Sequence, residues 1–118
     1  MAGTFNLPAG SALELSGSAN KVLDDNAVFN NFGSTRVTGP GKLLANGYNY
    51  GSTWNNFAGA SFGLTVGGSS FGTRNGNLIT FNNFAGATFA KMGGTNSTVA
   101  FVVLNNRGNL DCETGVMA

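Results

Sequence analysis

The stretch FNNFGSTRV (29–37) decides the fold, because its opening phrase recurs along the chain. WNNF stands at 54–57, FNNF stands again at 81–84, and a divergent copy, LNNR, stands at 104–107. Self-similarity at a nearly constant interval is the sequence signature of a repeat architecture. The chain is therefore expected to fold as a stack of similar units.

When the copies are aligned on their second asparagine, called the anchor here, the flanking positions form chemically matched columns. The anchors are Asn31, Asn56, Asn83 and Asn106. The column two residues before the anchor holds Phe29, Trp54, Phe81 and Leu104, and the column six residues after it holds Val37, Phe62, Phe89 and Cys112. Apolar residues at alternate positions indicate strands with one face turned inward. The same alternation predicts an earlier copy anchored near Ala9.

The repeat interval predicts a β-solenoid. Neighbouring anchors stand 22 to 27 residues apart, which is too short for a propeller blade. No segment shows helical spacing of apolar residues, and 19 glycines interrupt the chain every few positions. We therefore expect a single all-β domain over 1–118, with about five rungs of short strands, parallel pairing between rungs and no significant helix.

The anchor column has a physical role in such a stack. An inward asparagine at a bend can bond its amide to the equivalent amide in the rungs above and below. Asn31, Asn56, Asn83 and Asn106 are therefore expected to form a structural ladder. A glycine follows each anchor closely, which indicates a bend that a side chain would oppose.

The segments FNNFGSTRVTGPGKLLANG (29–47), FNNFAGATF (81–89) and VVLNNRGNLDCETG (102–115) resemble the repeats of right-handed parallel β-helices in large bacterial surface proteins. The resemblance is to filamentous-haemagglutinin-like adhesins and autotransporter passenger domains, and it extends over nearly the whole chain. It implies a right-handed coil that serves as a rigid stalk or adhesive segment, at the cell surface or secreted. It supplies no catalytic residues. The chain departs from the family in the phenylalanine that follows three of the anchors.

Charge and terminal sequence limit the expected partners. Six basic and five acidic residues give a net charge of +1, and the basic residues are scattered singly. Nucleic acid is therefore not an expected partner, because phosphate tracking needs a basic stripe. The opening MAGTFNLPAG lacks the basic start and apolar run of a signal peptide, and no segment is long and apolar enough to insert into a membrane.

The inventory of reactive residues argues against an enzyme. There is no histidine, which removes the commonest general base and zinc ligand. Asp24 and Asp25 read as a turn rather than half of a calcium site, and Asp111 and Glu113 read as a solvated pair near the end of the repeat array. No metal, cofactor or catalytic residue is expected.

The main alternative function is that of a carbohydrate-binding or carbohydrate-processing β-helix. A third possible function is ice binding, which needs flat columns of outward threonines, but Thr35, Thr38, Thr65 and Thr88 are out of register.

Two groups of aromatic residues are candidates for contact with a glycan, a host surface or another partner. Tyr48 and Tyr50 lie in a loop-like segment. Phe32, Phe57 and Phe84 follow the anchors and would form an exposed stripe if strand alternation continued through the bend. Burial of phenylalanine is worth roughly 2 kcal/mol, which favours the alternative in which the bend turns the rings inward.

Two further expectations concern the last copy and the ends of the stack. Cys112, the only cysteine, shares a column with apolar residues and is expected to be a small buried hydrophobe; the alternative is an exposed thiol at the last rung that forms an intermolecular bridge. The outermost strands of a solenoid offer open edges, so end-to-end self-association is expected.

Overall fold

The computed structural model describes residues 2–47, 50–74, 76–94, 97–98, 102–113 and 115, and the secondary structure within these ranges is entirely β. The strands are β1 (Thr4–Leu7), β2 (Ala12–Leu15), β3 (Lys21–Asp24), β4 (Val28–Asn31), β5 (Ser34–Val37), β6 (Leu43–Asn46), β7 (Ser52–Asn56), β8 (Ser61–Leu64), β9 (Gly68–Ser69), β10 (Phe71–Thr73), β11 (Ile79–Asn83), β12 (Thr88–Lys91), β13 (Ser97–Thr98), β14 (Val102–Asn106) and β15 (Asn109–Cys112). The predicted all-β class is confirmed.

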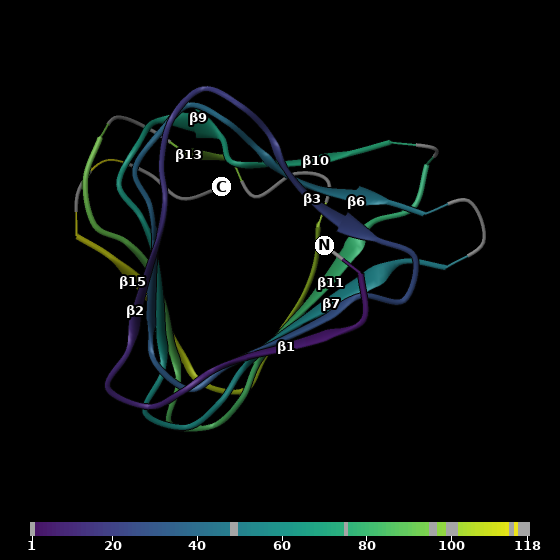
Figure 1. Cartoon of the computed structure of the whole chain (residues 1–118). Coiled ribbons are helices and arrows are strands. Elements are labelled where there is room, and N and C mark those ends of the chain that lie inside the picture. The colour runs from purple at the N-terminus through teal and green to yellow at the C-terminus, as the bar shows by residue number, and fades with distance from the viewer. Residues whose placement is uncertain are drawn as a thin grey trace.

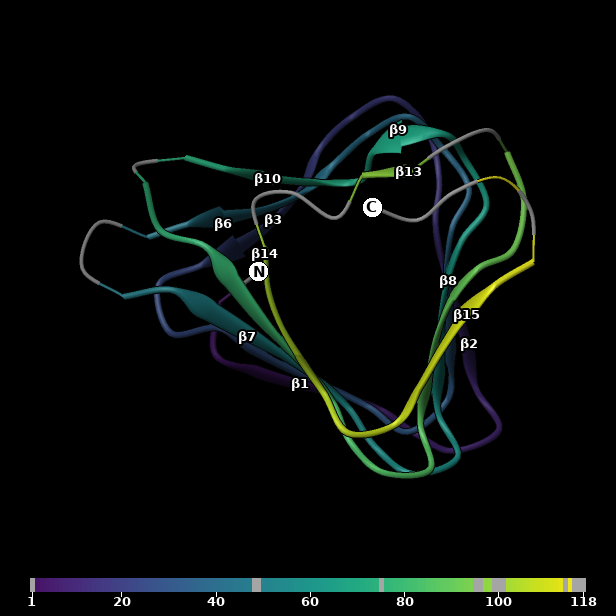
Figure 2. The same cartoon turned by 180° about the vertical axis from the view of Figure 1, so that it is seen from behind.

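The strands wind into a coil whose sides are parallel sheets. One side has the strand order β1-β4-β7-β11-β14, the next has β15-β12-β8-β5-β2, and the third has β10-β6-β3 with the short pair β13-β9 beside it. Seen down its axis, the chain runs clockwise as it recedes from the N-terminus (Figure 1), and the view from behind brings the C-terminal strands to the front (Figure 2). The chain is thus a right-handed parallel β-solenoid.

The coil makes about four turns, fewer than the five rungs expected from the anchors. The sides built from β1 and β2 each contain five strands, whereas β3, β6 and β10 form a three-stranded sheet. Between the five strands of one sheet, the chain goes around the axis only four times. Counting anchors therefore overestimated the number of turns by one.

The column two residues before the anchors lies as predicted and forms part of the core. Phe29 stacks on Trp54 with ring centroids 3.9 Å apart, and both rings are buried. Phe81 continues the column on the other side of Trp54. The ring of Phe62 packs edge-on against Phe81, with the ring centroids 4.9 Å apart. Aromatic rings packed in these two arrangements add specific attraction to the burial of their area.

The columns after the anchors differ from the alignment by two residues, because the copies use bends of different length. Asn31 reaches β5 through a short bend, whereas Asn56 reaches β8 through a longer one that contains Gly59 at a φ of +83°. Phe62 consequently pairs with Thr35 and not with Val37.

The first copy shows the same two-residue difference: Leu7, not Ala9, pairs with Asn31. Strand alternation has a period of two, so these shifts preserve which side chains face inward. Only their partners in the neighbouring rungs change.

The last column also corrects the expectation for Cys112. Cys112 pairs with Lys91, which pairs in turn with Leu64, and Leu64 pairs with Val37. Val37 and Leu64 are buried. Cys112 itself is exposed, because β15 is the outermost strand of its sheet. Lys91 is fully buried in this column, and its ammonium group donates to the carbonyl oxygen of Gly93.

Thr35 provides a test of the packing. Its hydroxyl is fully buried and has no hydrogen-bond partner among the described residues. We predict that Thr35→Val stabilises the protein by about 1 kcal/mol, since valine has the same shape without the unpaired hydroxyl. Urea denaturation measures the change, and Thr88→Val, at a position on the outside of β12, is the neutral control. A destabilised Thr35→Val variant would show that the hydroxyl is needed.

Candidate functional site

The anchor asparagines lie side by side at the bends that follow β4, β7, β11 and β14. The side-chain nitrogen of Asn31 donates to the amide oxygen of Asn56, that of Asn56 donates to Asn83, and that of Asn83 donates to Asn106, each over 2.8 Å. Asn31, Asn56 and Asn83 are fully buried. We call this row of amides the inner ladder.

The inner ladder also fastens the bend of the next rung. Asn31 donates a second hydrogen bond to the carbonyl oxygen of Ser61 at 3.0 Å, and Asn56 donates one to Thr88 at 2.9 Å. Asn83 repeats the contact with Asn109 at 3.1 Å. Each of these amides therefore uses both N–H groups inside the protein, as a buried polar group must. These three amides have a structural role and offer no free donor to a ligand, whereas Asn106, at the end of the ladder, is exposed.

A second row of asparagines runs along the outside of the same strands and was missed in the sequence analysis. Asn30 donates to Asn6 at 2.9 Å, Asn55 to Asn30 at 3.0 Å, Asn82 to Asn55 at 2.9 Å, and Asn105 to Asn82 at 3.0 Å. We call this row the outer ladder. Every NN pair in the sequence indicates this row, because adjacent residues of a strand face opposite sides and the first asparagine must point outward if the second points inward.

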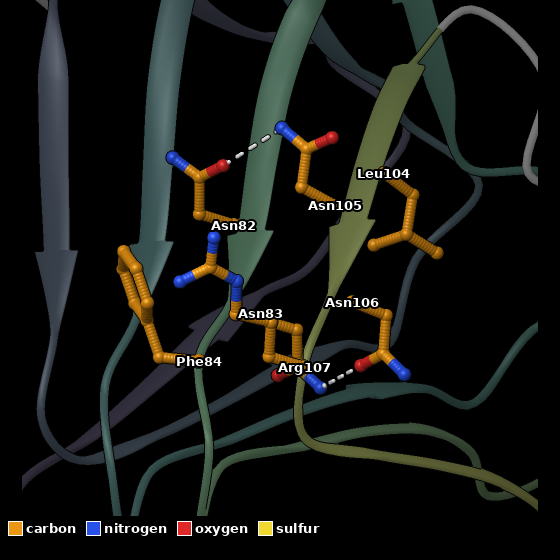
Figure 3. Close-up of a pocket in the computed structure, with 7 residues that line it drawn as sticks. All are labelled: Asn82, Asn83, Phe84, Leu104, Asn105, Asn106 and Arg107. Atoms are coloured by element: carbon orange, nitrogen blue, oxygen red, sulfur yellow. Dashed lines mark hydrogen bonds between the residues drawn. The ribbon is translucent and has the colours of Figure 1, made fainter.

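The two ladders donate in opposite directions along the coil. Figure 3 shows both directions at one step: Asn105 donates back to Asn82, whereas Asn83 donates forward to Asn106. Each interior amide of the outer ladder gives one N–H and accepts one hydrogen bond within the row. One N–H and one acceptor position remain, and they face solvent.

The phenylalanines that follow the anchors stack outside the core, and the favoured expectation that they pack inward is wrong. Phe32 and Phe57 have ring centroids 4.6 Å apart and planes 7° apart, and Phe57 and Phe84 follow at 5.2 Å and 11°. Phe32 is 41% exposed, and Phe57 and Phe84 are half-buried. The rings bury much of their area against one another, which removes the cost that argued for inward packing.

This stacking limits what the stripe can bind. Sugar rings pack against the open face of an aromatic ring, but the faces of Phe57 are covered by its two neighbours. The ring edges are the parts left toward solvent. The stripe is thus an apolar ridge and not a platform for a sugar.

The tyrosine pair is described only in part. Tyr50 is 60% exposed, and its backbone N–H donates to the Asp25 carboxylate at 3.3 Å. Tyr48 lies outside the described residues. Trp54, which is close in sequence, belongs to the core.

An open hollow of about 490 Å³ lies beside the ends of both ladders. It is lined by Asn82, Asn83, Phe84, Leu104, Asn105, Asn106 and Arg107 (Figure 3). Arg107 takes the position that phenylalanine holds in the three preceding copies, so the ridge ends there. The hollow combines amides, one aromatic ring and one cation, and it contains no carboxylate.

The acidic residues lie far apart along the coil. Glu14 lies near one end of the coil, and Asp111 and Glu113 lie exposed at the other. Asp25 is held in a turn beside Asn26, which has a φ of +56°. Within the described ranges no three residues of the kinds that ligate metals are grouped together.

The described part of the chain contains no helix that could cross a membrane. A comparison with protein-family models, with curated proteins and with solved structures finds no match to this chain.

We predict that Phe57→Ser lowers the free energy of unfolding by about 1–2 kcal/mol, because the ring is half-buried on the ridge. Phe81→Ser, in the core column, is expected to lower it by about 3–5 kcal/mol. Urea denaturation of both variants gives the comparison. Equal losses would show that the ridge belongs to the core.

Proposed function

We propose that the chain is a non-catalytic structural or adhesive β-helix module of a bacterial surface or secreted protein. The observation that carries the proposal is the inner ladder, which links four consecutive rungs by hydrogen bonds of one length, the first two of them fully buried. A buried, fully satisfied polar network fixes one arrangement of its members. The coil therefore resists sliding or separation of its rungs, which is the property that a stalk requires.

The side chains on the surface support a scaffold rather than an enzyme. Acid–base chemistry on a glycan requires two carboxylates on either side of the bond that breaks. The hollow beside Arg107 is lined by no carboxylate, and a second hollow, on the outside of β2 and β5, is lined by Glu14 alone among the acidic residues. The resemblance to adhesin repeats supports placement at the cell surface or outside the cell, and this placement belongs to the proposal.

Carbohydrate binding is the second candidate, and the hollow beside Arg107 is the observation that favours it. Amide groups and an arginine are the donors that sugar hydroxyls and carboxylates accept from. A glycan array separates the two candidates. Binding to an acidic glycan that is lost in Arg107→Ala would favour this candidate, and a silent array would remove it.

End-to-end association with a second copy is the partner proposal. β1 and β14 are the outermost strands of one sheet, and Asn6 and Asn105 end the outer ladder there. A second coil could continue both the strand pairing and the donor direction of the ladder. Light scattering that shows a strict monomer at every concentration would contradict it.

The scaffold function is tested by amide hydrogen exchange. We predict that the amides of β4, β7 and β11 exchange only through global unfolding, with one common free energy, because the inner ladder couples their rungs. A rung that opened several kcal/mol below the others would contradict a rigid stalk. Release of reducing ends from a polysaccharide panel would contradict the non-catalytic assignment.

A further inference from the structure

The outward side of the sheet β1-β4-β7-β11-β14 carries two regular columns of side chains. Each strand contributes a threonine or valine, and two residues later an asparagine of the outer ladder. The columns are Thr4, Val28, Thr53, Thr80 and Val103, and Asn6, Asn30, Asn55, Asn82 and Asn105. We call these ten residues the outer face. It contains none of the four threonines that the sequence analysis considered for ice binding.

The outer face is a repeating lattice. All four junctions between its strands are parallel and pair the columns residue for residue, without a bulge. Strands in such a sheet lie about 4.8 Å apart, and side chains two residues apart on one strand lie roughly 6.6 Å apart. Five strands therefore present two ranks of groups at constant intervals over a height of about 19 Å.

The groups of the outer face are held in place before any ligand arrives. The amides are fixed by the outer ladder at 2.9 to 3.0 Å, and threonine and valine are stiff at their first side-chain torsion. Groups ordered in advance lose little conformational entropy on binding. Each interior amide still presents one N–H and one acceptor position outward.

The chemistry of the outer face matches a neutral, ordered and hydrogen-bonding surface. None of its ten side chains is charged. Valine and threonine each present a methyl group in one column, and the neighbouring column presents amides. Apolar and hydrogen-bonding groups therefore lie side by side in register on every strand. The outer face has no aromatic ring, which is the group that binds a polysaccharide by stacking. In the ridge beside it, both faces of the central ring, Phe57, are covered by its neighbours. Ordered water fits this face better than a sugar polymer does.

We propose that the outer face binds the surface of ice by holding a first layer of water in register with its two columns. Bound waters that bridge fixed polar groups are nearly as favourable as direct hydrogen bonds. The methyl groups of the threonine and valine column limit the orientations of the water between them. This inference does not depend on the proposed scaffold function, since a rigid coil could have either role alone or both.

The probe is ice itself. We expect the protein to slow the coarsening of ice crystals in a frozen sucrose solution and to become incorporated into a slowly growing ice hemisphere. Thr53→Tyr, which places a bulky ring at the centre of the outer face, is expected to abolish both effects. Thr88→Tyr is the matched control, because Thr88 is a half-buried outward residue of the neighbouring sheet. Thermal unfolding of each variant verifies the fold.

The outcomes are distinct. Activity that is lost in Thr53→Tyr and kept in Thr88→Tyr supports the assignment, and Thr80→Tyr replaces the first variant if that one does not fold. A wild-type protein without effect on ice overturns it. The assignment is also overturned if all variants keep the activity on ice, or if Thr53→Tyr and Thr88→Tyr lose it equally. Co-sedimentation with crystalline cellulose without an effect on ice would assign the face to an ordered polysaccharide instead, and the hydrogen-exchange test of the scaffold is unaffected by any of these results.

Discussion

The constraint on which the structure depends is that two adjacent asparagines on one strand must face opposite sides of a sheet. In each NN pair the second amide turns into the coil and the first turns to solvent. Because the rungs are parallel and in register, each amide meets its equivalent in the next rung. One dipeptide, repeated, thus builds a buried fastening and an ordered surface within the same strands.

The two ladders share geometry but not energetics. Asn56 donates both of its N–H groups inside the protein, so its loss would leave buried partners without hydrogen bonds. Asn55 hydrogen-bonds its two neighbours in the row and is only half-buried. The opposed donor directions also bring the dipoles of the two rows into opposition. A long coil built in this way accumulates little net dipole from its asparagines.

Much of the fold could be predicted from the sequence, whereas the surface could not. The column before the anchors was right because β7 and β11 have the same length and pair residue for residue up to the anchor. The columns after them shifted because the length of a bend, such as Phe32-Gly33 against Phe57-Ala58-Gly59-Ala60, changes register without changing which side faces inward. The stripe of Phe57 was one of two alternatives, and inward packing was favoured over it because burial by stacking between rungs is not visible in a single strand. The outer ladder was missed because only one asparagine of each pair was assigned a role.

The most direct test of this account compares Asn56→Ala with Asn55→Ala, two identical changes at adjacent residues. Asn56→Ala is expected to lower the free energy of unfolding by about 3–5 kcal/mol, because several buried partners lose their hydrogen bonds. Asn55→Ala should lower it by less than about 1 kcal/mol, because water replaces the lost contacts. Urea denaturation of both variants measures the difference. Equal losses of unfolding free energy in the two variants would contradict the claim that the inner ladder is structural while the outer ladder remains open to solvent.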